Sequence, residues 1–368
     1  MNRRLSPIAF VAIAVISLAL PACKSKDNTL APPPPGPAWV TVQRSTQSNL
    51  LDNRINTLSV GVDGTIWIAT DSGATTFSGG NWGFVKDSLR YTSFGSGGGT
   101  SYSYKLNSIA HGMDGSIWFG LAGGGVKRYH PGSAFYVWRS YNVPDIAFGT
   151  ISAVSADALL YGDVWVATPV AGISRYVPSL TLPDQGDWHT YTSTTTPQIL
   201  TNQVKTTAHN DLNNSVWFGT YLGAISYNES DGWGNVVLPV DQGGVIVSIG
   251  FDNQNNVWFG KNAGASLGVT KYNRTSGDFT SYTHDNTGGV LPDGGVNVLT
   301  TDFRKIRWFG TSGGLARLDD TTWTAFNTGN RPELPSDTVT ALTYDRKGNL
   351  WIGTANGIAV YNPDGTRF

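Results

Sequence analysis

The sequence predicts an all-β protein, a seven-bladed β-propeller built from four-stranded antiparallel blades. Three observations support this fold. A short phrase centred on tryptophan occurs seven times, each copy lies among turn residues and short β-prone runs, and the two ends of the repetitive region carry complementary fragments of one repeat. Self-similarity at such a period is typical of solenoids and propellers, and four short strands per period indicate a propeller.

The first 22 residues have the features of a secretory signal peptide. Arg3 and Arg4 precede an apolar stretch over residues 8–20, which as a helix would reach about 20 Å and cannot span a hydrocarbon core of about 30 Å. Residues 20–23 resemble the bacterial lipobox, in which the cysteine after the cut is acylated. Cys23 is the only cysteine and cannot form an internal disulfide. We expect lipidation at Cys23, with an ordinary secreted protein as the alternative.

Residues 23–37 are expected to form a lipid-anchored stalk. The four consecutive prolines 32–35 favour an extended, semi-rigid polyproline II conformation. Lys24 follows the cysteine in place of Asp, which in Gram-negative bacteria favours delivery to the outer membrane. The sequence therefore predicts a lipoprotein of the bacterial cell envelope, and leaves open whether it faces the periplasm or the cell surface.

The repeats fill residues 38–368. The tryptophans at the centres of the seven successive phrases are 51, 47, 52, 41, 50 and 43 residues apart. Their second strands are predicted at Ile66–Thr70, Ile117–Leu121, Val164–Thr168, Val216–Thr220, Val257–Lys261, Arg307–Thr311 and Leu350–Thr354. The thirteen tryptophans all fall on predicted second or fourth strands. We therefore expect them to be buried wedges between blades rather than ligand-stacking residues.

The ends of the chain predict how the ring closes. The seventh repeat stops after its third strand, near Tyr361, whereas residues 38–42 have the pattern of a fourth strand with no strands before them. Pairing this N-terminal strand with the last blade would remove two exposed sheet edges. We expect the N-terminal strand to complete the seventh blade.

The phrase Val339–Ile358 resembles the two-component regulator propeller repeat. That resemblance implies the extracytoplasmic sensor half of a hybrid histidine kinase, a part thought to bind saccharides or other extracellular ligands. Such kinases continue into a further β domain, a membrane helix and kinase parts, whereas this sequence ends at Phe368. The expectation is a stand-alone propeller without signalling through its own chain. A weaker similarity is to streptogramin lyases, whose catalytic His and Glu match no motif here.

Composition argues against several classes of function. Without Arg3 and Arg4 the chain has 23 basic and 26 acidic residues, a net charge of −3, and this balance argues against nucleic acid as a partner. The five histidines show no metal-ligand spacing, and phosphate loops and nucleophile elbows are absent from the sequence. We predict neither a cofactor nor a metal site.

Candidate site residues lie where the first strands begin, because first strands line the channel of a propeller. Six of seven side chains in one register are polar, and neighbouring cations add positive charge. The register is Asn56, Asn107, Ser152, Lys205, Val247, Asn297 and Thr340, and the cations are Arg54, Lys105 and Lys205. One interpretation is a hydrogen-bonding ring for a small polar, slightly preferably anionic, ligand. The alternative is a water-filled channel that tolerates polar groups.

A long insertion follows the first repeat on the same predicted face. Aromatic and basic residues flank a Gly/Ser stretch in it, which is the composition of adaptable binding loops but also of disordered segments. Its candidate contact residues are Arg90, Tyr91, Phe94, Tyr102 and Tyr104. A shorter insertion, residues 262–267, lies on the same face.

Fold does not determine function, and three hypotheses remain. The first is a membrane-anchored, sensor-like propeller without catalytic activity that binds a small polar or saccharide-like ligand, or an envelope protein, at the channel mouth. The second is an envelope scaffold that uses the long insertion for assembly with other proteins. The third is an enzyme of the lyase or hydrolase type, for which the sequence shows no clustered acid and base groups.

Overall fold

A computed structural model describes residues 37–94, 100–131, 137–157, 162–179, 181, 185–264, 267–292, 294–302, 304–366 and 368. The expected signal peptide, Cys23 and nearly all of the expected stalk lie outside these residues. All described residues belong to one compact unit.

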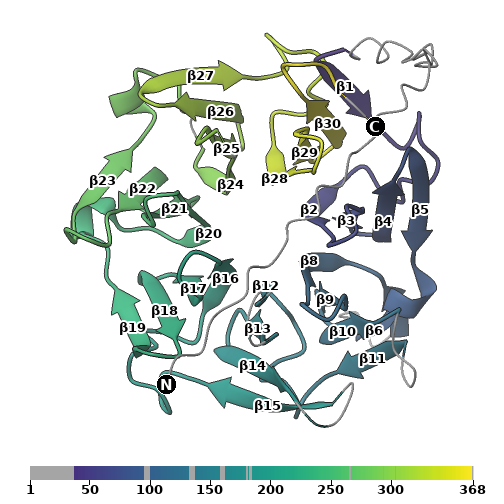
Figure 1. Ribbon diagram of the computed structural model, residues 1–368, viewed down its shortest axis with the longest axis vertical. Coiled ribbons are helices and arrows are strands. Elements are labelled where there is room, and N and C mark those ends of the chain that lie inside the picture. The colour runs from purple at the N-terminus through teal and green to yellow at the C-terminus, as the bar shows by residue number, and fades with distance from the viewer. Residues whose placement is uncertain are drawn as a thin grey trace, which may run out of the picture. The chain divides into compact units, whose positions relative to one another are not determined.

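In the described residues, seven four-stranded antiparallel sheets surround a central axis, as Figure 1 shows. The predicted fold class is confirmed. The first blade contains β2 to β5, the second β8 to β11 and the third β12 to β15. Their strands are β2 Ile55–Val60, β3 Ile66–Thr70, β4 Gly73–Ser78, β5 Asn81–Val85, β8 Leu106–His111, β9 Ile117–Leu121, β10 Val126–Tyr129, β11 Trp138–Tyr141, β12 Ala153–Ala156, β13 Val164–Ala167, β14 Ile173–Pro178 and β15 Gly186–Tyr191.

Blades four to seven continue the same order from the channel outward. Their strands are β16 Val204–Asn210, β17 Ser215–Thr220, β18 Ala224–Asn228, β19 Gly232–Val236, β20 Ile246–Phe251, β21 Val257–Lys261, β22 Gly268–Tyr272, β23 Phe279–Tyr282, β24 Val296–Thr301, β25 Arg307–Thr311, β26 Gly314–Asp319, β27 Thr322–Phe326, β28 Val339–Tyr344, β29 Leu350–Thr354 and β30 Gly357–Tyr361.

The ring closes as predicted. Strand β1 (Trp39–Val42) pairs antiparallel with β30 and becomes the outer strand of the seventh blade, with Trp39 opposite Tyr361 and Val42 opposite Ile358. The Trp39 and Tyr361 rings lie 4.5 Å apart between centroids. A backbone hydrogen bond from Asn362 N to Ala38 O extends the pairing beyond the strands. The two ends of the propeller are therefore joined within one sheet.

The core consists of seven hydrophobic clusters, one at each blade junction of the described ring. In each, the second-strand tryptophan reaches the neighbouring blade: Trp67 packs edge-on against Phe119, and Trp351 lies 5.2 Å from Phe77 between ring centroids. All seven of these tryptophans are at most 7% exposed. For these seven the expected role as buried wedges is confirmed, whereas the six fourth-strand tryptophans are only partly buried. A ring held by such side chains positions all loops of one face together.

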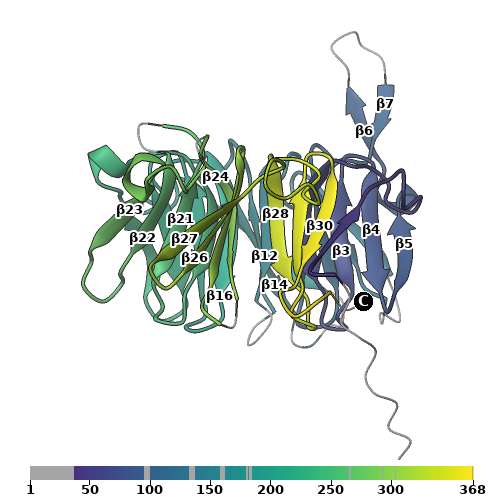
Figure 2. The same cartoon turned by 90° about the horizontal axis from the view of Figure 1, so that it is seen from above.

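A two-stranded hairpin stands outside the ring. Strands β6 (Tyr91–Phe94) and β7 (Thr100–Ser103) pair antiparallel within the long insertion after the first blade. Figure 2 shows this hairpin projecting from one face of the propeller. Three short 3₁₀ helices, η1 (Asp87–Leu89), η2 (Val240–Gln242) and η3 (Asp285–Thr287), are the helical elements of the described residues. None of them has the length or apolar content needed to cross a membrane.

Candidate functional site

One face of the propeller carries the candidate residues, and we call it the mouth face. It is formed where first strands begin, by the connections from each fourth strand to the next first strand and by those between second and third strands. The β6–β7 hairpin belongs to one of these connections. Residue 37, where the described chain begins, lies with the C-terminal residues on the opposite face, since Thr366 donates two hydrogen bonds to the Pro37 carbonyl.

The predicted polar register lies at a recurrent β-bulge. In six blades the pairing of first and second strands shifts by one residue at this position: Asn56, Asn107, Lys205, Val247, Asn297 and Thr340. A bulge frees its residue from the ladder and redirects the side chain. In the remaining blade, Ser152 directly precedes β12 and its N–H donates to Ala167 O.

Four of these side chains hydrogen-bond the next blade. Asn56 donates to Leu106 O at 2.8 Å and Asn107 to Ile151 O at 2.7 Å. Asn297 and Thr340 donate in the same way, to the first-strand carbonyls of Val339 at 3.1 Å and Ile55 at 2.5 Å. These bonds satisfy carbonyls at the blade junctions. They give the polar register a structural role, which neither sequence interpretation included.

The predicted cations Arg54 and Lys105 meet an anion that the sequence argument missed. Asp71, in the connection after β3, accepts from Asn56 at 2.8 Å. Its carboxylate lies 3.3 Å from Lys105 Nζ and 3.8 Å from Arg54 Nε. This group neutralises part of the positive charge at the rim between blades one and two. Arg54 remains well exposed, with 61% of its side chain accessible.

Lys205 has a different environment on the other side of the channel. Its ammonium lies 4.8 Å from the centroid of the Tyr221 ring, in a cation–π arrangement. Tyr221 is 42% exposed. The pair therefore presents an aromatic face and a positive charge to solvent at the mouth.

The hairpin rests on the propeller through Tyr91. A Cβ at Gly124 would lie 2.6 Å from the Tyr91 ring, so this ring packs directly on the backbone between β9 and β10. Lys127 Nζ donates to the carbonyls of Ser88 at 2.8 Å and Arg90 at 2.9 Å. Burial lowers the pKa of Lys127, and Arg90 lowers it further. These contacts hold the base of the hairpin in place.

The exposed side of the hairpin carries two cation–π pairs. The Arg90 guanidinium lies 4.6 Å from the Tyr102 ring, and Lys86 Nζ lies 4.9 Å from the Tyr104 ring. Tyr102 is 61% exposed. Phe94 ends β6, and the Gly/Ser stretch 95–99 lies outside the described residues. Exposed aromatic and arginine side chains are the residues enriched in binding surfaces.

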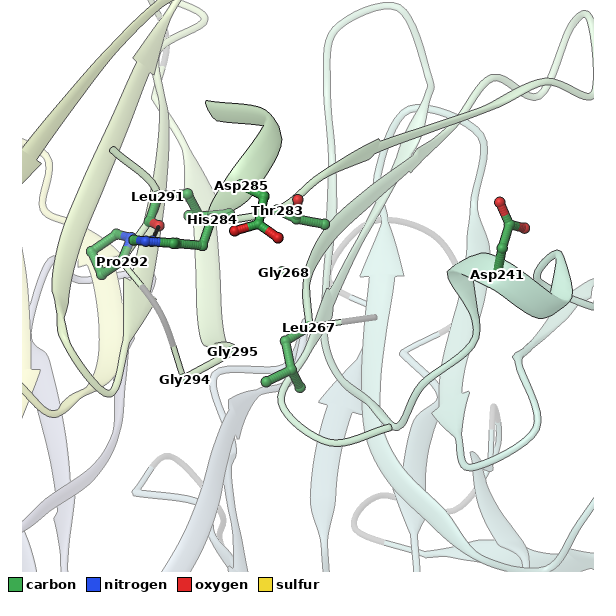
Figure 3. A pocket seen from close by; sticks show the side chains of 10 residues that line it. All are labelled: Asp241, Leu267, Gly268, Thr283, His284, Asp285, Leu291, Pro292, Gly294 and Gly295. Carbon is green, nitrogen blue, oxygen red and sulfur yellow. Dashed lines mark hydrogen bonds between the residues drawn. The ribbon is translucent and has the colours of Figure 1, made fainter. Parts of the chain in front are cut away.

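A pocket of about 340 Å³ opens on the mouth face at blade five, near the predicted insertion 262–267. Figure 3 shows Asp241 on one side of the pocket and Thr283, His284 and Asp285 on the other. His284 Nδ1 bonds Leu291 O at 2.9 Å. Three connections separated in sequence build this pocket, and for that reason no local motif predicted it.

Within the described ranges no group of three or more His, Cys, Asp and Glu side chains could hold a metal ion. His111 and His209 lie near the far ends of first strands, as predicted. Burial lowers the pKa of His111 to about 4, against an opposing effect of Asp63. Burial also lowers the pKa of His209, but its hydrogen bond to Asp211 and the charge of Asp157 raise it more.

These features define a β-propeller with a hairpin-bearing face. The resemblance to the two-component regulator propeller is confirmed, because the family model of that repeat matches residues 333–356. The match contains β28 and β29 with the connections around them. No curated protein matches the sequence.

Several solved structures share the fold. The extracellular domain of BT3049 from B. thetaiotaomicron, assigned to a hybrid two-component system, is 19% identical with a TM-score of 0.64; the match covers 84% of this chain and 40% of that one. PorZ, a surface component of the type-IX secretion system of Porphyromonas gingivalis, is 18% identical with a TM-score of 0.62, covering 84% and 46%. A streptogramin B lyase is 15% identical with a TM-score of 0.62, covering 88% and 97%.

At these identities the comparisons establish the fold alone. The chain spans less than half the length of the BT3049 and PorZ structures.

Proposed function

We propose that the protein is a non-catalytic, sensor-like binding propeller of the bacterial cell envelope, held to the membrane by a lipid on Cys23. It engages an envelope protein with the mouth face, and the β6–β7 hairpin provides the main contact. The observation that carries this proposal is the hairpin itself, a projecting element with exposed Arg90 and Tyr102. Rigid aromatic and arginine side chains are the usual anchors of binding energy.

The geometry of the chain supports an outward-facing mouth. The described chain enters the propeller at residue 37 on the face opposite the hairpin. A stalk that leads from a membrane to this point would leave the hairpin directed away from the lipid. The comparison structures are consistent with such a location, because one is an extracellular domain and another a bacterial surface component.

A small polar or saccharide-like ligand at the channel mouth is the second candidate. The exposed pair of Lys205 and Tyr221 favours it, whereas the amide donors of Asn56 and Asn107 already bond neighbouring blades. An enzymatic function has less support, because three ionisable groups at the mouth, Arg54, Lys105 and Asp71, pair with one another at the rim.

The anchor is tested by metabolic labelling with palmitate. The full-length chain should incorporate the label and fractionate with membranes, and Cys23→Ala should lose both properties. A labelled Cys23→Ala variant, or an unlabelled wild type, would contradict the lipid anchor.

The contact surface is tested by a photo-crosslinking amino acid at Tyr102 in the producing organism. Position 62 is the matched control, because Val62 is 58% exposed and lies in a connection on the opposite face. We expect one crosslinked envelope protein from position 102, none from position 62, and loss of the product in Arg90→Glu. Equal products from both positions would refute the hairpin as the contact element.

A further inference from the structure

The blade-five pocket has the size of a small-ligand site. Its volume of about 340 Å³ lies at the lower end of the range for ligand pockets, so a molecule about as large as a monosaccharide fits. The pocket is separate from the hairpin, which leaves the ring between blades one and two.

The wall that carries Asp241 is held by buried polar contacts. Lys261 is fully buried and its Nζ donates to Gln242 O at 2.7 Å, beneath the η2 helix. Ser281 Oγ donates to the Gln242 side chain at 2.8 Å. Burial lowers the pKa of Lys261 to about 8, and Asp241 opposes this effect. Most other repeats have Thr where this lysine stands, so the contact belongs to this blade.

The opposite wall is held by a dense set of local hydrogen bonds. The Asn286 side chain accepts from Thr283 N at 2.8 Å and donates to Ser281 O at 2.9 Å. Thr287 Oγ1 donates to Thr283 O at 2.8 Å and accepts from Leu291 N at 3.0 Å. Leu291 is 1% exposed and anchors the segment in the core between blades five and six. Both walls are therefore pre-organised, which lowers the entropic cost of binding.

The floor of the pocket requires glycine. Gly295 has a φ of +82°, and a Cβ there would lie 2.6 Å from Asn262 Cα. A Cβ at Gly268, at φ +123°, would lie 2.2 Å from Tyr282 O. The first close approach joins the connection after β21 to the connection before β24, and the second lies between the paired strands β22 and β23.

The side chains that line the pocket are rich in hydrogen-bond acceptors. Asp241 and Asp285 offer carboxylates from opposite sides (Figure 3). His284 Nδ1 faces the Leu291 carbonyl. Because a carbonyl only accepts, Nδ1 carries a proton, and in the neutral imidazole Nε2 is an acceptor. The neighbouring cation, Lys261, is directed at Gln242 O. Ligands with hydroxyl or ammonium donors suit this lining, and anions are repelled.

We infer that this pocket binds a small, donor-rich ligand of neutral or positive charge, about the size of a monosaccharide. Asp241 and Asp285 accept its donors, and an ammonium group beside either carboxylate strengthens the interaction. The site lies on the mouth face at blade five, away from the hairpin between blades one and two, and its acidic lining differs from the cationic hairpin surface of the proposed function.

The test uses three hexoses of equal size and different charge on the full chain: glucosamine, glucose and glucuronate. Calorimetric titration should give a Kd in the millimolar range or tighter for glucosamine, weaker binding of glucose and no binding of glucuronate. The double variant Asp241→Asn, Asp285→Asn should weaken glucosamine binding by about tenfold or more. These isosteric changes preserve the volume of both side chains.

Controls separate this site from other effects. Asp278→Asn removes an exposed carboxylate on the opposite face of the same blade and should leave glucosamine binding unchanged. Arg90→Glu in the hairpin should also leave it unchanged, so this pocket and the proposed hairpin contact can fail independently. Circular dichroism verifies that each variant is folded. The inference is overturned if no hexose binds at millimolar concentration, if glucuronate binds as well as glucosamine, or if the double variant binds normally.

Discussion

The residue two positions after the second-strand tryptophan is small because the next blade packs on it. A Cβ at Gly353 would lie 2.6 Å from Ile55 Cγ2, and one at Gly310 would lie 2.5 Å from Val339 Cγ1. Both contacts join a second strand to the first strand of the following blade. The sequence shows the repeated small residue but not its cause, because the contacting side chain belongs to the next repeat.

Gly353→Val is expected to destabilise the protein by about 1–3 kcal/mol, the usual cost of overpacking a core. The added methyl groups would press Ile55 away at the junction of blades seven and one, whereas Gly353→Ala adds a single methyl and should cost less. Equilibrium urea unfolding, followed by tryptophan fluorescence, measures both. A valine variant as stable as the wild type would show that this junction is not closely packed.

The first strands show which properties of an element the sequence could reveal. Their positions, their order and their polar register were predictable from the period alone. The bulges of the first strands and the hydrogen-bond acceptors of their side chains could not be predicted. Asn56, for example, donates a hydrogen bond to a carbonyl 50 residues away. The hairpin was missed for a related reason: the Gly/Ser stretch has the composition of a loop, while the pairing of Tyr91 with Ser103 depends on the support of Gly123 and Gly124 below it.

Asn107→Ala and Lys205→Ala, both in the predicted register, are expected to differ in their effect on stability. Asn107→Ala removes the hydrogen bond to Ile151 O and should lower the free energy of unfolding by about 1 kcal/mol. Lys205→Ala changes an exposed cation–π pair and should remain within about 0.5 kcal/mol of wild type. Urea midpoints provide the comparison. Equal losses of unfolding free energy in the two variants would mean that the inter-blade hydrogen bond of Asn107 contributes nothing. If Lys205→Ala leaves the fold unchanged, it is the suitable variant for ligand tests at the mouth.

At the scale of the whole molecule, closure converts seven marginal sheets into one cooperative unit. The number of blades was predictable from the seven repeats. The N-terminal completion of the last blade was predictable from the incomplete repeats at the two ends. The blade-five pocket could not be found in this way, since its walls come from connections of irregular length whose approach depends on the finished ring. The role of Asp71 was not predicted because its ion-pair partner Lys105 belongs to the next blade.

Deletion of residues 38–44 should destabilise the entire propeller by several kcal/mol and reduce the cooperativity of its unfolding. The deletion removes β1, exposes the edge of β30, and takes away the Trp39 ring, which lies 5.7 Å from Phe326 in blade six. An exposed edge also favours pairing between copies, so size-exclusion chromatography should show association. As a control, replacing residues 92–102 with a short glycine linker removes most of the projecting hairpin but keeps Tyr91, which packs on Gly124, and should preserve the urea midpoint and slope. The opposite result is a deletion variant that stays monomeric and unfolds with the wild-type midpoint and slope. In that case the N-terminal strand does not stabilise the ring, and the seventh blade must be stable with three strands.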